Sequence, residues 1–363
     1  MSDFVRLADF RHAGEALAIL RRGLDSGRPP HALLISGPPG VGKRTLSRAY
    51  AAAIFCERGA DCEGCDVCRR LAERRHPDFL VVRRVDRSLK EQAPLDDVEE
   101  DALDATARKT LSTLIRVFQV RELTHHASFA SKEAPARLFV VDPADRMNLE
   151  AQNALLKTLE EPPPTTRILL LTTRPHRLLP TVRSRCLQVR LPALPPAVLA
   201  RSLQDEGMDP NEARERAGLS GGRPGFARSL DPESRRAARE ARLELLEACA
   251  GGGVRALAEL SDWVGVVGVG SEPELQEGLD GLAELLREGL RLAVGAPAET
   301  LLDPALEARI GAVAERLGLD RAAAALEDLD RTRDALRFNL NRTLAVEAWL
   351  ATLAGAGSPH PRG

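Results

Sequence analysis

Aromatic residues and unbalanced charge are both scarce in this chain of 363 residues. Nine Phe, two Trp and one Tyr make up 3% of the sequence, and the formal net charge is only −2. A chain without a strong positive charge has little long-range attraction for phosphate backbones, so autonomous DNA binding is disfavoured. Ala, Leu, Arg and Glu are abundant instead, which favours a largely helical protein.

Long apolar runs are absent as well. No uninterrupted run of about 18 apolar residues occurs, and the opening MSDFVRLADFRH lacks the apolar core of an export signal. We therefore expect no membrane segment and a cytoplasmic location. In a reducing compartment the six cysteines point to metal ligands or free thiols rather than to disulfides.

The stretch HALLISGPPGVGKRT at 31–45 has the pattern of a phosphate-binding loop. Its apolar start predicts a buried parallel strand, its glycines predict a tight loop, and the residues after it have helical spacing. Backbone N–H groups, the start of the helix and a lysine can together hold phosphate oxygens. The alternative is a structural turn in an α/β domain. The candidate phosphate-binding residues are Gly37, Gly40, Gly42 and Lys43.

The same loop is poorly suited to magnesium. The full pattern has Ser or Thr directly after the lysine as a metal ligand, but this chain has Arg44 there and Thr45 one place later. A shift of one residue turns a helical side chain by about 100 degrees, so we expect Thr45 to face elsewhere. Thr45 stays a nucleotide-binding candidate, and the loop suits the phosphates of ATP better than it suits Mg²⁺.

Four of the six cysteines lie close together in CERGADCEGCDVC at 56–68. Two interlocked C-x-x-C steps supply four thiolates that can reach one tetrahedral centre, and soft sulfur ligands select zinc. With all four positions taken by sulfur, such a knuckle is closed and structural rather than catalytic. Iron–sulfur or redox chemistry, and four unligated thiols, are the alternatives. The predicted ligands are Cys56, Cys62, Cys65 and Cys68.

Further buried strands are predicted downstream of the loop. The run 138–141 ends in Asp142, and an acid at the carboxyl end of a parallel strand steers the magnesium of a bound nucleotide. The next position, which usually carries the acid that orients water, is Pro143, and Asp145 is the nearest substitute. Thr172 ends another strand and is a further nucleotide-binding candidate. The predicted strands are 79–82, 138–141, 167–173 and 187–191.

Helical patterns surround these strands. Apolar spacing predicts helices at 12–26 and 110–123, and Asn148 is predicted to cap a helix that runs through Glu160. The acidic segment 86–108 is interpreted as a solvated excursion rather than as a site.

Three motifs together resemble the clamp-loader ATPases of the AAA+ superfamily: LEAQNALLKTLEEPP at 149–163, LLLTT at 169–173 and SRC at 184–186. With the cysteine knuckle they are similar to the gamma/tau and delta-prime family of bacterial DNA polymerase III, closely over residues 28–192. The resemblance implies an α/β AAA+ P-loop domain, with a parallel sheet flanked by helices, followed by a small helical lid and an all-α collar. The predicted boundaries are 1–192 for the P-loop domain, 193–235 for the lid, 236–355 for the collar and 356–363 for a tail.

Departures from the family pattern favour its delta-prime type. A motor subunit keeps a hydroxyl at 44 and an acid pair at 142–143, whereas this chain has Arg44 and Pro143. Loss of a general base alone costs about a hundredfold to ten-thousandfold in rate. We therefore expect no intrinsic ATP hydrolysis, with the nucleotidyl transfer of the holoenzyme residing in a partner. The alternative is an active gamma/tau-type ATPase that uses Thr45 and Asp145 in shifted roles.

The arginine of the SRC tripeptide, Arg185, is intact. In the family this arginine reaches the nucleotide of a neighbouring subunit, and an arginine supplied in trans is worth about a thousandfold or more in rate. The resemblance thus implies a catalytic arginine finger. The lid arginine of active relatives aligns here with Gly225, although Arg223 lies two residues before it.

The resemblance also implies partners. The collar is expected to bind gamma/tau and delta subunits, while contact with the sliding clamp and primed DNA is indirect. A zinc-dependent nucleic-acid-binding module is a third alternative, which the near-neutral charge disfavours.

Overall fold

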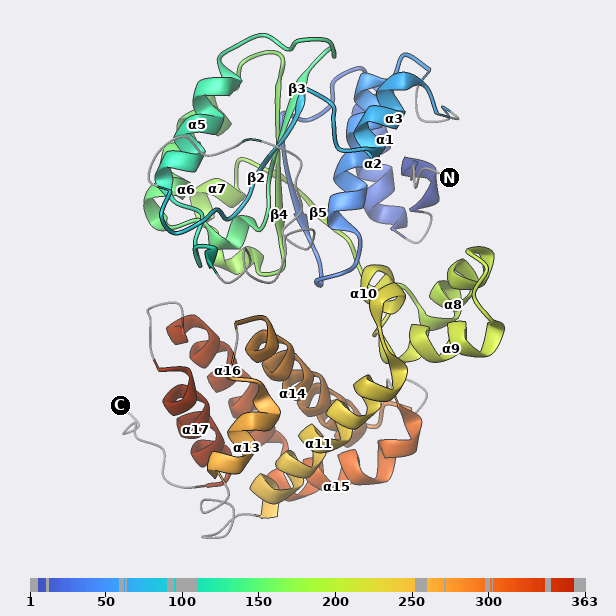
Figure 1. The fold of residues 1–363 in the computed structure, drawn as a ribbon, viewed down its shortest axis with the longest axis vertical. Helices are drawn as coiled ribbons and strands as arrows, with labels where there is room; N and C mark the ends of the chain where they lie inside the picture. Colours follow the sequence, from blue (N-terminus) through green and yellow to red (C-terminus); the bar gives the residue numbers. More distant parts are fainter. Residues whose placement is uncertain are drawn as a thin grey trace. The chain divides into compact units, whose positions relative to one another are not determined.

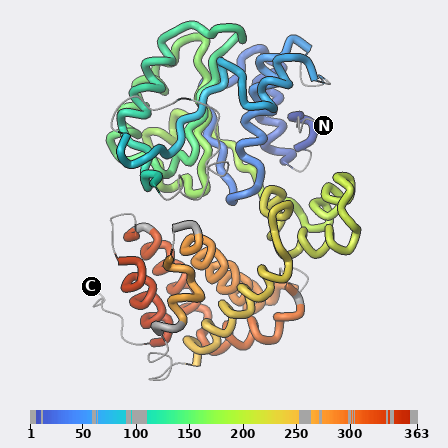
Figure 2. Tube along the Cα trace, viewed as in Figure 1, coloured from blue at the N-terminus to red at the C-terminus, as the bar shows by residue number. Residues whose placement is uncertain are grey.

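The chain is described by a computed structural model and forms two compact units (Figure 2). The first unit comprises Met1–Leu199 and Gly222–Phe226, and the second comprises Ala200–Gly221 and Ala227–Gly363. Most of the acidic segment 86–108 and all of the tail 356–363 lie outside the described residues. The described residues are 6–10, 13–58, 62, 64–89, 95, 110–251, 260–270, 272–297, 301, 303–336 and 341–355.

A five-stranded parallel sheet forms the centre of the first unit (Figure 1). Its spatial order is β2-β3-β4-β1-β5, and its register places Leu33 opposite both Leu169 and Leu187. Every predicted strand is confirmed to within one residue at either end. The strands are β1 (Ala32–Ser36), β2 (Phe79–Val82), β3 (Arg137–Val141), β4 (Thr166–Thr172) and β5 (Leu187–Arg190).

Helices cover both faces of the sheet because its central strands are apolar on both sides (Figure 1). In β1, Leu33 and Ile35 join the apolar layer on one face, while Ala32 and Leu34 join the layer on the other. The first layer contains α1 (Gly14–Asp25), α2 (Lys43–Phe55) and α3 (Asp66–Ala72). The second contains α5 (Val117–Ala127), α6 (Leu149–Glu160) and α7 (Pro180–Arg183).

The helix predicted over 110–123 is wrong in its first half, because α5 begins only at Val117. The backbone of Ile115 is used in tertiary pairing: its N–H donates to Arg146 O at 2.8 Å and its carbonyl accepts from Asn148 N at 3.0 Å. These bonds to a distant segment override the local helical spacing.

Helices make up the described part of the second unit, in agreement with the all-α region that the resemblance implies for 236–355. Their apolar faces meet in one core, which includes Leu246, Leu282 and Leu350. No helix among the described residues is both long and apolar enough to span a membrane. The bundle consists of α11 (Pro232–Gly251), α13 (Leu260–Val267), α14 (Glu272–Ala293), α15 (Glu307–Leu317), α16 (Leu319–Ala335) and α17 (Arg342–Leu353). Before it come α8 (Pro196–Asp205), α9 (Pro210–Leu219) and α10 (Pro224–Ser229).

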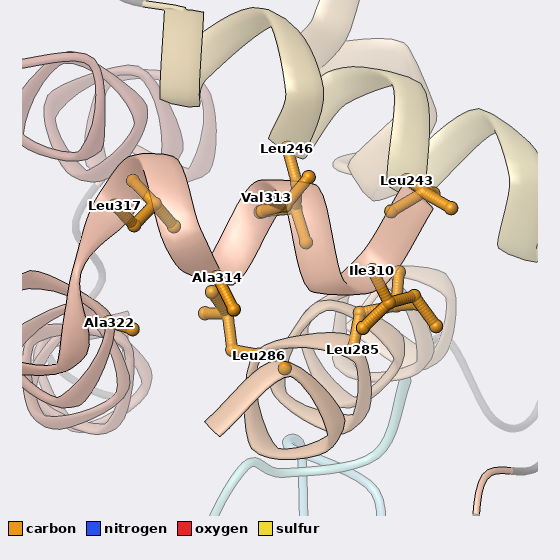
Figure 3. A pocket seen from close by; sticks show the side chains of 10 residues that line it. Leu243, Leu246, Leu285, Leu286, Ile310, Val313, Ala314, Leu317 and Ala322 are labelled. Atoms are coloured by element: carbon orange, nitrogen blue, oxygen red, sulfur yellow. The ribbon is translucent and has the colours of Figure 1, made fainter. Parts of the chain in front are cut away.

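A small cavity lies within this bundle, between α11, α14 and α15 (Figure 3). Its volume is about 10 Å³, and its lining side chains, such as Leu243, Leu286 and Ile310, are all apolar. A water molecule needs at least about that volume together with polar partners. The cavity is therefore a packing gap in the helical core and not a ligand site.

Candidate functional site

The loop between β1 and α2 is shaped by its glycines. Gly40 and Gly42 have φ angles of 74° and 97°, in the left-handed region that favours glycine. A Cβ on Gly37 would lie 2.3 Å from the carbonyl oxygen of Leu191, so no larger residue fits there. The chain therefore turns tightly and delivers Lys43 as the first residue of α2.

Lys43 is buried and bonded to its own loop. Its Nζ donates to the carbonyl oxygens of Gly37 and Pro38, both at 2.8 Å. Burial lowers the pKa of Lys43 to about 8, while the nearby carboxylates of Asp142 and Asp145 oppose that shift. The ammonium group thus stays mostly protonated at pH 7, and an incoming phosphate has to exchange these two carbonyl bonds for its own.

The position where the family pattern has a magnesium site contains an ion pair. Asp142 follows β3, and its Oδ2 accepts a hydrogen bond from Nε of Arg44 in the first turn of α2. The two side chains are 26% and 11% exposed, so the pair is largely shielded from water. Pro143 follows Asp142 and offers neither an acid nor an N–H group. The negative charge of Asp142 is therefore balanced by the guanidinium of Arg44.

Asp145, the nearest substitute for the missing acid, is bonded to the end of β4. Its Oδ1 accepts from the hydroxyl of Thr172 at 2.7 Å and from Thr173 N at 3.2 Å. The Thr172 hydroxyl also accepts from Arg174 N at 2.9 Å. Asp145 is only 4% exposed. Its hydrogen bonds to Thr172 and Thr173 join the loop after β3 to the end of β4. Thr45 lies one residue beyond Arg44 in α2 and is half-buried.

The segment that aligns with the lid arginine of active relatives packs on the glycine loop. Gly225 N donates to Gly40 O at 3.0 Å, and a Cβ on Gly225 would lie 3.2 Å from that oxygen. The guanidinium of Arg223 stacks on the ring of Phe226, with its Cζ 4.6 Å from the ring centroid. The sequence pattern did not predict the hydrogen bond between Gly225 and Gly40, which lie far apart in the chain.

The four predicted metal-binding cysteines form one cluster. Their sulfur atoms all lie within 4.8 Å of one another, and the sulfurs of Cys56 and Cys65 are 3.6 Å apart. A Zn–S bond of about 2.3 Å gives a tetrahedral S···S edge of about 3.8 Å, so the cluster fits a metal ion such as zinc. Backbone N–H groups of Cys65 and Gly64 lower the pKa of the Cys62 thiol to about 6, whereas burial raises the pKa of the Cys56 and Cys68 thiols. Cys68 completes the set.

Arg185 lies in the turn between α7 and β5 and is held by two other elements. Its Nη2 donates to Glu160 Oε1 at 2.5 Å, and its Nη1 donates to Thr181 O at 2.9 Å. The side chain remains 33% exposed. The sequence predicted Glu160 only as the end of a helix and not as a site residue, although it stands in the LEEPP motif.

Sheet order and loop together define the class of this protein. A parallel sheet ordered β2-β3-β4-β1-β5, with a glycine-rich loop and lysine after β1 and an acid after β3, is a P-loop α/β domain, as the resemblance to the AAA+ clamp-loader family implies. A family model described as DNA polymerase III, delta subunit, matches residues 13–195. The chain belongs to this family.

Individual relatives carry related descriptions. The chain is 38% identical over 226 residues to DNA polymerase III subunit delta' of Pseudomonas aeruginosa, a match that covers 60% of each chain. It is 33% identical over 190 residues to DNA polymerase III subunit tau of Escherichia coli, covering 52% of this chain and 25% of that relative. A solved DNA polymerase III gamma subunit-related protein of Thermotoga maritima aligns over 93% of this chain and 98% of its own, with 19% identity and a TM-score of 0.38.

Proposed function

We propose that this chain is a clamp-loader subunit of the delta-prime type, which does not hydrolyse ATP itself and supplies Arg185 to the nucleotide of a neighbouring ATPase subunit. Family membership supports the clamp-loader part, and the relatives include the delta' subunit of Pseudomonas aeruginosa at 38% identity. The observation that carries the proposed lack of ATP hydrolysis is the ion pair of Arg44 with Asp142.

This ion pair argues against hydrolysis in the chain's own loop. A P-loop ATPase uses a hydroxyl and an acid to hold Mg²⁺, which neutralises charge on the β- and γ-phosphates. Here both positions are taken, since Arg44 replaces the hydroxyl and binds the acid, Asp142. Pro143 removes the group that would orient water. A triphosphate bound without a divalent cation lacks the ion that would neutralise the negative charge on its β- and γ-phosphates.

An active gamma/tau-type ATPase is less well supported. Such an enzyme would need Asp145 to orient water and Thr45 to hold the metal. Asp145 is buried and already accepts hydrogen bonds from Thr172 and Thr173. Redirecting this carboxylate would leave the buried Thr172 hydroxyl without its acceptor, which costs about 1–3 kcal/mol.

The remaining parts of the proposal concern metal and partners. Zinc is proposed to be held by the cysteine cluster as a closed structural site, without a role in catalysis. The helical region 236–355 is proposed as the collar that binds gamma/tau and delta subunits, following the lid at 193–235. Contact with the sliding clamp and primed DNA is proposed to be indirect, and the location to be the cytoplasm, where the thiols stay reduced.

A hydrolysis assay of the purified chain tests the non-hydrolysing part. The lone chain is expected to release phosphate from ATP no faster than its Lys43→Ala variant. The loader assembled from this chain with gamma/tau and delta subunits is expected to hydrolyse ATP in the presence of clamp and primed DNA. Hydrolysis by the lone chain at the rate of the assembly, abolished by Lys43→Ala, would favour the gamma/tau-type alternative instead.

A further inference from the structure

The guanidinium of Arg185 is fixed from two directions. Glu160 Oε1 accepts from Nη2 at 2.5 Å, and Thr181 O accepts from Nη1 at 2.9 Å. Glu160 ends α6 and Thr181 belongs to α7, so separate helices hold one side chain. Nε of Arg185 has no partner among the described residues, and each Nη keeps a second hydrogen. The group is therefore oriented while donors remain for an outside anion.

The position of Glu160 is unfavourable for the helix that carries it. A negative charge at a helix C-terminus is repelled by the partial negative charge of the last carbonyl groups. Glu161 directly follows and is exposed, with no side-chain partner in the described part of the chain. Of these two adjacent exposed acids, only Glu160 contacts Arg185 in the described part of the chain.

Fold stability does not explain this contact. The side chains of Arg185 and Glu160 are 33% and 49% exposed, and ion pairs with that much exposure contribute little to stability. The contact does restrict the orientation of Arg185, because an unheld arginine side chain has many rotamers. Donors that stabilise a transition state act best when they are already in place before the reaction.

We propose that Glu160 is a positioning residue, which holds Arg185 extended and oriented toward the nucleotide of the adjacent subunit. The inference rests on the proposed function of Arg185 as a finger in trans. Glu160 acts through Arg185 and touches no nucleotide. Its own negative charge does not attract phosphate, so its contribution lies in the rate of the chemical step rather than in ATP affinity.

Single-turnover ATP hydrolysis by the assembled loader tests this role. The Arg185-dependent phase is defined as the phase that Arg185→Ala removes. Glu160→Gln is expected to slow this phase about tenfold, because even a small misplacement of a catalytic group lowers rates strongly. The ATP concentration that half-saturates the phase is expected to stay unchanged. Glu160→Asp keeps the charge but withdraws the carboxylate by one methylene, so it is also expected to be slower than wild type. The matched control Glu161→Gln is expected to behave as wild type.

The double variant Glu160→Gln/Arg185→Ala separates positioning from a structural role. It is expected to equal Arg185→Ala alone, since Glu160 has nothing left to position. The inference is overturned if Glu160→Gln leaves the phase within twofold of wild type, or if it slows the Arg185→Ala assembly further. If Arg185→Ala itself removes no phase, the finger assignment fails first and takes this inference with it.

Discussion

Replacing Arg44 by Ser should restore a cation site at Asp142. In the wild-type chain a divalent cation on Asp142 would lie roughly 4 Å from the guanidinium that shares this carboxylate. Two unit charges at that separation repel by about 4 kcal/mol at an effective dielectric constant of about 20, so a divalent cation is repelled by about 8 kcal/mol.

The side chain of Arg44 can avoid this repulsion at a lower cost in free energy. It is 26% exposed and can swing into water at the cost of its hydrogen bond to a charged group, about 1.5–3 kcal/mol. Displacing Arg44 costs less than the repulsion, so this displacement sets the penalty on cation binding. The penalty corresponds to about a tenfold to 150-fold weakening of cation binding. Arg44→Ser removes the cost and adds the hydroxyl that the magnesium pattern requires.

Titration with a fluorescent ATP analogue, once with Mn²⁺ and once with EDTA, measures this effect. The ratio of the two dissociation constants is expected to stay near one for the wild type and to favour Mn²⁺ by about tenfold or more for Arg44→Ser. Arg48→Ser, one turn further along α2, is the matched control and should behave as wild type. Tighter binding with Mn²⁺ by the wild-type chain, or no gain in Arg44→Ser, would refute the reasoning.

Two further predictions concern stability. Cys68→Ser is expected to lower bound zinc from about one ion per chain to well below one and to lower the unfolding temperature, because a closed site loses a ligand. Metal analysis after dialysis checks this, with Cys186→Ser, buried outside the cluster, as control; unchanged zinc content in Cys68→Ser would contradict it. Asp78→Asn is expected to cost about 3–5 kcal/mol, because Asp78 is fully buried and its carboxylate accepts three backbone N–H groups and pairs with buried Arg137. Burial raises the pKa of Asp78, but these N–H donors and Arg137 outweigh it and hold the pKa below 3.8, so the stabilisation is present above pH 3.8 and lost as the pH falls further. Thermal unfolding should show a larger loss of stability below this pH in the wild type than in Asp78→Asn, which keeps only the loss from other carboxylates such as Glu206 and Glu247.

Local sequence patterns predicted the strands, the N-cap of α6 and the cysteine cluster well. Each strand is a short apolar run, and a strand buried on both faces needs little beyond that run. Asn148 was predicted to cap α6, and its Oδ1 accepts from Ala151 N at 2.9 Å. The cysteine cluster was predicted from spacing alone, because C-x-x-C steps bring sulfur atoms together locally.

Contacts between distant polar groups were out of reach for the same reasoning. Arg44 and Asp142 were each singled out, but their pairing joins residues that only the sheet order brings together. The arginines of α11 look like surface residues, yet Arg235 and Arg239 are buried and pair with acids of α14. Apolar periodicity carries no information about such pairs, because each partner satisfies the other wherever the fold places them.

ATP turnover by the loader assembled with the Arg185→Ala chain tests the central claim most directly. The variant chain should fold normally, since Arg185 is partly exposed and its ion pair adds little stability. The account predicts that turnover in the presence of clamp and primed DNA falls well below that of the wild-type assembly, whereas Arg190→Ala, an exposed arginine on β5, leaves turnover unchanged. Equal turnover by the Arg185→Ala and wild-type assemblies would contradict it.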